Sequence, residues 1–276
     1  MLFVWILLIL LTLAAVCWMF AMRCVRRKTG FYGFAADHYA HRGLHANDKG
    51  IPENSMLAFR LAVKAGFGTE LDVRLSKDGR LVIMHDDDLK RMCGVARDVR
   101  DMTAAELDEC RLLGTEEKIP YLEDVLPLFA GKTPMIIEIK PYRDDYTKLI
   151  EKVCAMLHKY PDVKFCIESF DPRVLMWLKK HRPDIVRGQL SCNFFHDSDV
   201  DLAPVLRFAL TNLLLNFIAK PHFVAYRLED RNQLSFCLCR KLWGVQEINW
   251  TVKNAREAEA AMRDDRLIIF EGFLPE

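Results

Sequence analysis

The chain has 276 residues, of which 51% are hydrophobic, and a formal net charge of +1. This length fits one domain of about 250 residues or two small ones, and the composition excludes a disordered tail, a collagen-like fibre and a small disulfide-rich scaffold. The near-neutral charge argues against a dedicated nucleic-acid-binding protein, which would carry a clear excess of basic residues.

The charge is distributed unevenly along the chain. Residues 1–22 have no charged side chain, four basic residues follow within 23–28, and the rest of the chain has 35 basic and 38 acidic residues. Twenty-two helical residues reach about 33 Å, which is enough to cross the hydrocarbon core of a membrane. We therefore predict a transmembrane anchor at 1–22, a basic juxtamembrane linker at 23–36 and a globular domain at 37–276.

Two other interpretations of the first segment stay open. A cleaved signal peptide has a basic start and an apolar stretch of about 7–15 residues, whereas this run is longer and starts uncharged. A helix buried within the globular domain agrees less well with the basic residues that follow. Because positive charge is usually retained in the cytoplasm, we expect a single-pass membrane protein with a cytoplasmic domain, although the other side is not excluded. The nine cysteines, odd in number and without paired spacing, agree with a reducing compartment.

Short apolar runs alternate with helical patterns through the rest of the chain. The runs predict strands at 38–42, 68–73, 135–139, 164–168, 186–190, 223–226, 245–251 and 267–271. The helical patterns predict helices at 55–65, 104–112, 121–130, 144–159, 172–181, 201–217, 229–242 and 254–264. Eight strand–helix units in about 240 residues favour a closed (β/α)8 TIM barrel. An open doubly wound sheet is the alternative, although no G-x-G-x-x-G or P-loop pattern supports nucleotide binding.

A hairpin is predicted at 68–85, with its turn centred near Asp78. Paired residue numbers would then sum to about 157, which would place His85 beside Asp72. The returning arm need not belong to the barrel, so the strand count is unaffected. Residues 86–134 form a longer excursion, which we interpret as an insertion over the barrel mouth after the second barrel strand.

Polar side chains gather at the carboxyl ends of the early strands, which meet at one mouth of a barrel. The set comprises His41, Arg42, Glu70, Asp72, His85, Glu138 and Lys140. Members two residues apart in one strand, such as Glu70 and Asp72, point to the same face. Each has an ordinary structural explanation when taken alone. Charges inside runs that a parallel sheet buries on both faces are nevertheless costly, which favours one shared site.

The chemistry of such a site follows from charge. The carboxylates of Glu70, Asp72 and Glu138 would repel one another unless a cation or a proton separated them. Oxygen ligands suit one hard divalent ion, Ca²⁺ or Mg²⁺, better than zinc. With Arg42 and Lys140 nearby, the anion that fits best is a phosphate. Since two histidines can act as general base and general acid near neutral pH, the pattern predicts hydrolysis or intramolecular transfer at a phosphodiester.

Seven short motifs follow one another through residues 39–276. They are A-H-R-G at 40–43, P-E-N-S at 52–55, E-L-D-V at 70–73, D-G-R-L-V-I-M-H-D at 78–86, E-I-K at 138–140, E-S-F at 168–170 and N-W-T-V at 249–252. In their order and spacing they resemble the glycerophosphodiester phosphodiesterase family. The resemblance implies a TIM barrel with an insertion after the second strand. It also implies hydrolysis of glycerophosphodiesters to sn-glycerol 3-phosphate and an alcohol, with Ca²⁺ or Mg²⁺.

The resemblance also implies roles by motif position. His41 and His85 would be the acid/base pair. Arg42 and Lys140 would bind the phosphate. The metal ligands would be Glu70, Asp72 and Glu138. Residues that would support or line the site are Glu53, Asn54, Glu168 and Trp250. Glu53 would lie beside or behind the ligands, Asn54 would support the first loop, and Trp250 would be either a wall for the substrate or ordinary barrel packing. One histidine would take the proton of the substrate's 2-hydroxyl, which attacks phosphorus, although direct attack by water stays open.

Two features depart from the family pattern. Glu271 stands where family members have the Asp of a T-D-x-P sequence, and we expect this change to affect the far wall of the site more than its catalytic core. The segment 206–220 is unusually apolar. It is either a buried barrel helix or a surface that rests on the membrane.

Three rival functions stay open. A lysophospholipase D acting on membrane lysolipids is motivated by the anchor and by the apolar segment. A phosphatidylinositol-cleaving phospholipase C is disfavoured, because bacterial forms often lack the three carboxylates. The third rival is a non-catalytic, membrane-tethered domain that binds phosphodiesters. The sequence points to a small-molecule substrate and to a membrane, and it identifies no protein partner.

Overall fold

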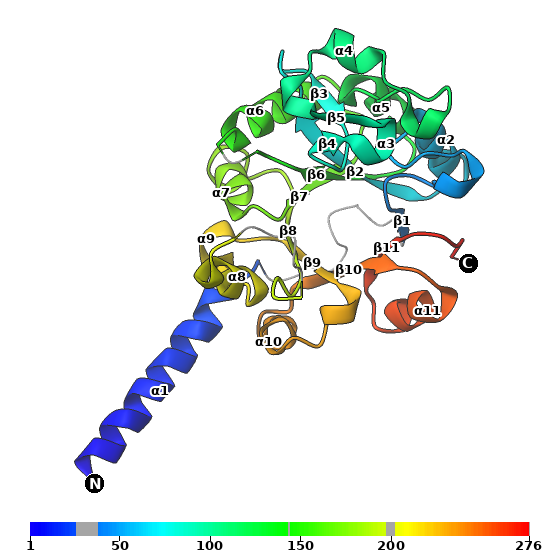
Figure 1. Cartoon of the computed structure of the whole chain (residues 1–276). Helices are drawn as coiled ribbons and strands as arrows, with labels where there is room; N and C mark the ends of the chain where they lie inside the picture. The colour runs from blue at the N-terminus through cyan, green and yellow to red at the C-terminus, as the bar shows by residue number, and fades with distance from the viewer. Residues whose placement is uncertain (26–37, 143, 197–201, 276) are drawn as a thin grey trace.

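Eight parallel strands form a closed ring in which neighbours in the chain are neighbours in the sheet (Figure 1). They are β1 (His38–Ala40), β2 (Gly68–Leu75), β6 (Met135–Ile139), β7 (Phe165–Ser169), β8 (Arg187–Ser191), β9 (Phe223–Arg227), β10 (Gln246–Val252) and β11 (Leu267–Phe270). β1 pairs with both β11 and β2, which closes the barrel. This computed structural model describes residues 1–25, 38–142, 144–196 and 202–275. The predicted TIM barrel is confirmed, and the open sheet is excluded.

Helices cover the outside of the barrel. They are α2 (Met56–Lys64), α5 (Leu122–Phe129), α6 (Tyr146–Leu157), α7 (Pro172–His181), α8 (Pro204–Thr211), α9 (Asn216–Ala219), α10 (Leu234–Trp243) and α11 (Ala255–Arg263). The apolar faces of α5, α6 and α7 bury Leu126, Val153 and Leu175 against β2, β6 and β7. Capping residues set where several helices begin: Ser55 accepts a hydrogen bond from Ala58 at the start of α2, and Asp171 caps α7.

The hairpin after β2 is confirmed, but its register differs by one residue from the predicted one. β3 (Leu81–Ile83) runs antiparallel to β2 with Val73 opposite Ile83. Met84, and not His85, therefore pairs with Asp72, whose carbonyl accepts the Met84 N–H at 3.1 Å. A three-residue turn centred on Asp78, closed by Gly79 at φ +81°, accounts for this register.

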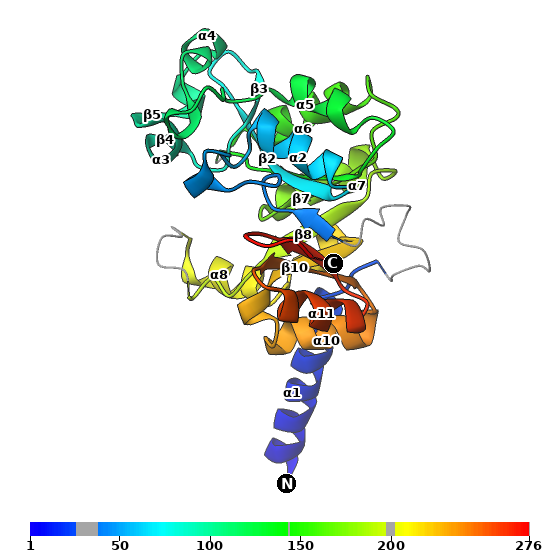
Figure 2. The ribbon, with the colours of Figure 1, turned by 90° about the vertical axis from the view of Figure 1, so that its right-hand side faces the viewer.

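A small insertion follows the hairpin and packs beside β2 (Figures 1 and 2). Its elements are β4 (Asp88–Leu89), α3 (Lys90–Cys93), β5 (Val95–Asp98), η2 (Val99–Asp101), α4 (Ala104–Asp108) and η3 (Leu112–Gly114). β4 and β5 form a two-stranded antiparallel sheet. The insertion buries its own apolar cluster, which includes Leu89, Met92 and Leu107. It therefore adds structure at one side of the barrel without interrupting the ring.

Three predicted helices have different bounds in the structure. The helix predicted at 201–217, whose first residue lies outside the described ranges, is broken into α8 and α9, because Leu213 takes a left-handed conformation with φ +58°. The helix predicted at 229–242 begins only at Leu234, after the 3-10 turn η4 (Leu228–Asp230). The helix predicted at 104–112 ends at Asp108. The apolar segment 206–220 is thus neither one helix nor wholly buried, since Phe208, for example, is exposed.

A single apolar helix precedes the barrel. α1 (Leu2–Ala21) is, by length and composition, long and apolar enough to cross a membrane, a test that a signal sequence also passes. Residues 1–17 are exposed, whereas its carboxyl end docks on the barrel beside α9 and α10 (Figure 1). There, Trp18 donates to Ser235 at 3.1 Å and Trp243 donates to the Met19 carbonyl at 3.0 Å. The basic residues at 26–28 and most of the predicted linker lie outside the described residues.

Candidate active site

A cavity of about 250 Å³ lies at the carboxyl ends of the barrel strands. It is lined by the side chains of His41, Arg42, Glu70, His85, Glu138, Glu168, Trp250 and Glu271, among others. Asp72 and Lys140 contact this set directly. The barrel therefore brings together all seven residues of the set that the sequence singled out, because the strands that carry them end at one mouth.

Three buried carboxylates cluster at the cavity: Glu70 and Glu138 line it, and Asp72 lies beside them. Oxygen atoms of Glu70, Asp72 and Glu138 lie within 4.8 Å of one another. They meet because Glu70 and Asp72 share one face of β2, and the parallel register places Asp72 opposite Glu138 on β6. Burial and the neighbouring carboxylates raise the pKa of Glu70 well above its ordinary value. Burial likewise raises the pKa of Glu138 to about 7.

This donor set fits a hard divalent cation. Asp72 Oδ1 is buried without a hydrogen-bond partner, although Lys140 Nζ lies 3.4 Å away. An ion of charge +2 would offset the repulsion that, together with burial, raises the pKa of Glu70, and oxygen-only ligands suit Ca²⁺ or Mg²⁺. A fourth carboxylate, Glu168, pairs in register with Glu138, and its Oε2 atom also lacks a hydrogen-bond partner. The cluster is thus consistent with a metal site.

Two cations border the carboxylates. Lys140 Nζ lies 2.9 Å from Glu138 Oε1. The Arg42 guanidinium lies 3.5 Å from Asp72 Oδ2 and pairs with Glu53 at 2.7 Å. Both side chains are mostly buried, so their charges act at close range on whatever enters the cavity. An anion is the ligand that this pair favours.

Each of the two histidines has a carboxylate behind it. His41 Nδ1 lies 2.7 Å from Glu271 Oε2, and His85 Nδ1 lies 2.7 Å from Asp86 Oδ1. A carboxylate accepts from Nδ1–H, which leaves Nε2 as the nitrogen that can accept a proton. Burial lowers the pKa of both imidazoles, although the hydrogen-bonded carboxylates oppose the shift. Near neutral pH, the two rings are therefore equipped to exchange protons through Nε2.

The contact between His41 and Glu271 contradicts one expectation. Glu271 was expected to affect the far wall more than the catalytic core, but it lies next to His41. The carboxylate follows β11, the last strand, and ring closure places β11 beside β1, whose last residue, Ala40, comes directly before His41. Sequence reasoning also missed Arg91, which donates to both Glu53 and Asp86. No local pattern marks Arg91, because its partners come from two other loops.

The supporting residues take definite positions. Asn54 donates from its side chain to Asp72 Oδ2 at 2.8 Å, and its backbone N–H donates to the Arg42 carbonyl at 2.8 Å. Glu53 contacts Arg42 rather than the three clustered carboxylates. Trp250 both lines the cavity and packs edge-on against Phe170, with its indole N–H donating to the Ala225 carbonyl. Packing and lining are therefore combined in Trp250.

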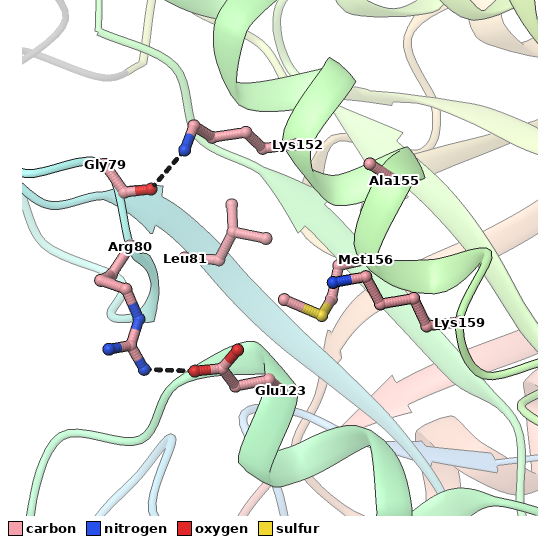
Figure 3. A pocket seen from close by; sticks show the side chains of 8 residues that line it. All are labelled: Gly79, Arg80, Leu81, Glu123, Lys152, Ala155, Met156 and Lys159. Carbon is pink, nitrogen blue, oxygen red and sulfur yellow. Dashed lines mark hydrogen bonds and ion pairs between the residues drawn. The ribbon is translucent and has the colours of Figure 1, made fainter.

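A second cavity of about 240 Å³ lies on the outer side of the barrel, between the hairpin turn and α6 (Figure 3). Four of its lining residues are paired with one another: Lys152 donates to the Gly79 carbonyl, and Arg80 pairs with Glu123 (Figure 3). It holds none of the clustered carboxylates or histidines. The cavity at the barrel mouth is therefore the candidate active site.

We expect the Glu53→Gln substitution to destabilise the protein by about 1–3 kcal/mol at pH 7, because it leaves two arginines short of a carboxylate. Burial raises the pKa of Glu53, but Arg91 and Arg42 outweigh it and hold this pKa at about 2. A depressed carboxylate pKa contributes stability that is present above the unfolded value and is lost as pH falls through the folded one. The difference in unfolding free energy, measured with urea, should therefore shrink below about pH 4.5. If the difference in unfolding free energy between the two proteins grew as the pH fell, the depressed pKa of Glu53 would be contradicted.

Known proteins share this fold, with sequences that are 23–33% identical to this one where they align. The family model described as "Glycerophosphoryl diester phosphodiesterase family" matches residues 41–264. A glycerophosphodiester phosphodiesterase of Bacillus altitudinis is 33% identical over 177 residues, which is 60% of this chain and 71% of the relative. The glycerophosphodiester phosphodiesterase structure from Thermotoga maritima has a TM-score of 0.63 and 26% identity, over 86% of this chain and 94% of that one. An Oleispira antarctica phosphodiesterase, solved with the product sn-glycerol-3-phosphate, has a TM-score of 0.69 at 23% identity, over 87% and 94% of the two chains.

Proposed function

The chain belongs to the glycerophosphoryl diester phosphodiesterase family, and from this premise we propose that it hydrolyses glycerophosphodiesters to sn-glycerol 3-phosphate and an alcohol, with one divalent cation. The observation that carries the proposal is the arrangement at the barrel mouth. Two histidines, each backed by a carboxylate, face one cavity with three buried carboxylates and two cations. The proposed metal site, phosphate site and acid/base pair would thus lie within one small volume.

The chain's own residues would divide the work as follows. Glu70, Asp72 and Glu138 would hold Ca²⁺ or Mg²⁺, and Arg42 and Lys140 would bind and orient the phosphate. The bound ion would offset negative charge on the phosphoryl oxygens. Preorganised positive charge in a cavity with little water stabilises a transition state more strongly than the same charge in solvent.

The two histidines would move the protons. One takes the proton from the 2-hydroxyl of the glycerol moiety through Nε2, and the 2-oxygen forms a bond to phosphorus. The bond from phosphorus to the alcohol oxygen breaks, and the other histidine protonates that oxygen. Water then opens the cyclic phosphate, with the two histidines in reversed roles. The outcome is one water consumed, one alcohol released and one sn-glycerol 3-phosphate formed.

The test is product identification with the purified full-length chain. Glycerophosphodiesters that differ in the alcohol group are incubated with Ca²⁺ or Mg²⁺. We expect release of sn-glycerol 3-phosphate and the free alcohol. Release of the phosphorylated alcohol would contradict the proposal, because it would place cleavage on the other side of phosphorus, and so would no turnover of any substrate with either ion.

The Glu271→Gln substitution is expected to lower kcat by about 10–100-fold with little change in KM, because Glu271 would act by positioning His41. The carboxylate opposes the burial that lowers the pKa of His41. Without it, that pKa falls further, so the limb of the pH–rate profile governed by His41 should move to lower pH. The measurement is kcat against pH for both proteins. An unchanged profile would mean that Glu271 does not act through His41.

We also propose that residues 1–22 anchor the protein in a membrane, with a linker at 23–36 and the catalytic domain at 37–276 on the cytoplasmic side. The end of α1 supports an uncleaved anchor, because Met22 and Cys24 are buried against the barrel and Trp18 bonds to it. A signal peptide would leave these contacts unmade after cleavage. Retention in the membrane pellet after carbonate extraction is the expected result. Protection of a carboxyl-terminal tag from protease in intact cells tests the side.

A further inference from the structure

A second group of side chains with metal-binding atoms lies at the edge of the candidate active site. One ring nitrogen of His41, one ring nitrogen of His45 and one carboxylate oxygen of Glu271 lie within 4.8 Å of one another. None of these residues belongs to the group of three carboxylates that would hold Ca²⁺ or Mg²⁺. The second group therefore offers an ion a separate set of ligands, with a different chemical preference.

The His45 imidazole has no structural role that its contacts explain. Both of its ring nitrogens are buried, and neither forms a hydrogen bond within the part of the chain that the structure describes. Such an imidazole costs free energy on folding, because its donor and its acceptor leave water without gaining partners in the protein. Coordination of an ion by His45 would offset part of this cost.

The loop that carries both histidines is held by its own backbone. The His41 N–H donates to the Phe270 carbonyl at 2.9 Å. The His45 N–H donates to the Gly43 carbonyl, also at 2.9 Å. Gly43 turns the chain between the two histidines at φ +82°, and a Cβ atom there would lie 2.8 Å from the Cβ of Ala58. The two imidazoles are thus brought together by a fixed turn, which lowers the entropy cost of binding an ion between them.

The third side chain comes from the end of the last strand. Glu271 follows β11, and its N–H donates to the Val252 carbonyl at 3.0 Å. Its Oε2 atom lies 2.7 Å from His41 Nδ1, whereas two ligands of a tetrahedral zinc ion lie about 3.3 Å apart. Only small movements of the side chains would therefore admit an ion. The Glu271 side chain is 33% exposed, so an ion can reach the group from solvent.

We propose that His41, His45 and Glu271 bind Zn²⁺, and that zinc bound there inhibits the enzyme. Two imidazoles and one carboxylate, with water in the fourth position, are a common set of ligands for zinc. Ca²⁺ and Mg²⁺ prefer oxygen ligands, so they would favour the three carboxylates instead. The zinc site itself goes beyond the proposed function, whereas the inhibition rests on it.

Inhibition would follow because zinc removes His41 from proton transfer. In the proposed reaction, His41 carries its proton on Nδ1 and accepts a second proton at Nε2. Zinc bound to Nδ1 would fix the tautomer whose proton is on Nε2, so that nitrogen could no longer accept the proton of the 2-hydroxyl. Zinc bound to Nε2 would block the same atom directly. Either mode stops the base while the three carboxylates keep their own ion.

Zinc binding is measured separately from activity, by isothermal titration calorimetry. The full-length protein, purified in detergent without a histidine tag, is titrated with Zn²⁺ in the presence of excess Mg²⁺. His45→Gln should weaken binding at least about tenfold, because even residues that only support a ligand change metal affinity by 10–100-fold. Glu138→Gln, which alters the other group, should still bind zinc. The control is His158→Gln, which removes an exposed histidine and should leave zinc affinity unchanged.

Inhibition is measured as choline release from glycerophosphocholine at a saturating concentration of Mg²⁺ or Ca²⁺, while buffered free Zn²⁺ is raised stepwise. The unaltered protein and His158→Gln should lose activity over the range of concentrations in which zinc binds. Without zinc, His45→Gln should turn over the substrate as the unaltered protein does. Its half-inhibition should require at least about tenfold more zinc.

The outcomes separate the zinc site, the inhibition and the proposed function. Equal zinc affinity in the unaltered protein and in His45→Gln, with melting curves that show both to be folded, would overturn the site. Zinc binding that depends on His45 but leaves turnover unchanged would overturn the inhibition. Turnover of no glycerophosphodiester under any condition would overturn the proposed function, and calorimetry would still decide whether the zinc site exists.

Discussion

Replacing either His41 or His85 with alanine is expected to lower kcat/KM for a glycerophosphodiester by about 10²–10⁴-fold, the contribution of a positioned general acid or base. Each imidazole lines the cavity and has its Nδ1 held by a carboxylate at 2.7 Å. Alanine removes the Nε2 atom that would accept or donate the proton. The double variant should lose far less than the product of the two single losses, because the pair acts as a unit.

The control for this experiment is His158→Ala. His158 is an exposed histidine at the end of α6, remote from the cavity lining, so the substitution should leave kcat/KM unchanged. Circular dichroism and melting curves would show that all the variants are folded. Near-normal hydrolysis by folded His41→Ala and His85→Ala proteins would remove the acid/base assignment.

Removal of divalent metal is expected to abolish hydrolysis, and addition of Ca²⁺ or Mg²⁺ to restore it. Glu70, Asp72 and Glu138 place three carboxylates within 4.8 Å, an arrangement that a bound cation stabilises. The ion should also raise the melting temperature, because a ligand that binds only the folded state stabilises it. Full activity after exhaustive chelation would rule out the metal site.

In the metal-free protein, Glu138→Gln is expected to raise stability at pH 8 by about 1–3 kcal/mol while abolishing the rise in melting temperature with metal. The sign follows from the raised pKa of Glu138, about 7, which burial produces. Between about pH 4.5 and pH 7, the folded state holds a proton that the unfolded state has lost, so stability falls as pH rises. The glutamine avoids that loss. Thermal unfolding with and without metal measures both effects.

Glu259→Gln provides a matched control, because Glu259 is an exposed carboxylate on α11. It should change neither the metal response nor the pH dependence of stability. If Glu138→Gln lowered the stability of the metal-free protein at pH 8, the cost of burying a charged Glu138 would not be the dominant effect at that position.

Much of the active site could be predicted because local rules place its parts. The alternation of side chains along a strand puts Glu70 and Asp72 on one face, and the same rule places Glu138 of β6 and Lys140, the residue after β6, on one side. Eight strand–helix units predict a barrel, and a barrel brings the carboxyl ends of its strands to one mouth. These inferences depend only on short-range geometry. The one-residue error in the hairpin register also came from short-range geometry. A small change in the assumed length of the turn shifts the pairing of every residue in the two strands.

The contacts between distant segments could not be predicted in this way. Glu271 meets His41 across 230 positions in the chain, and Arg91 reaches Glu53 from the insertion. The break between α8 and α9 depends on a left-handed Leu213, which its sequence pattern does not mark. Such contacts and breaks arise from closure of the barrel and from tertiary packing. Packing overrides the weak conformational preferences of single residues.

The sequence by itself determined the barrel, the convergence of histidines, carboxylates and cations at its mouth, and an apolar first helix. These follow from periodicity and from the charge that each strand carries. Only the tertiary structure decided which carboxylate stands behind each histidine, and that α8 and α9 pack against the carboxyl end of α1. The physical reason is that closure of β1 on β11 and the packing of α8 and α9 between the barrel and the end of α1 bring into contact side chains that are far apart in the sequence.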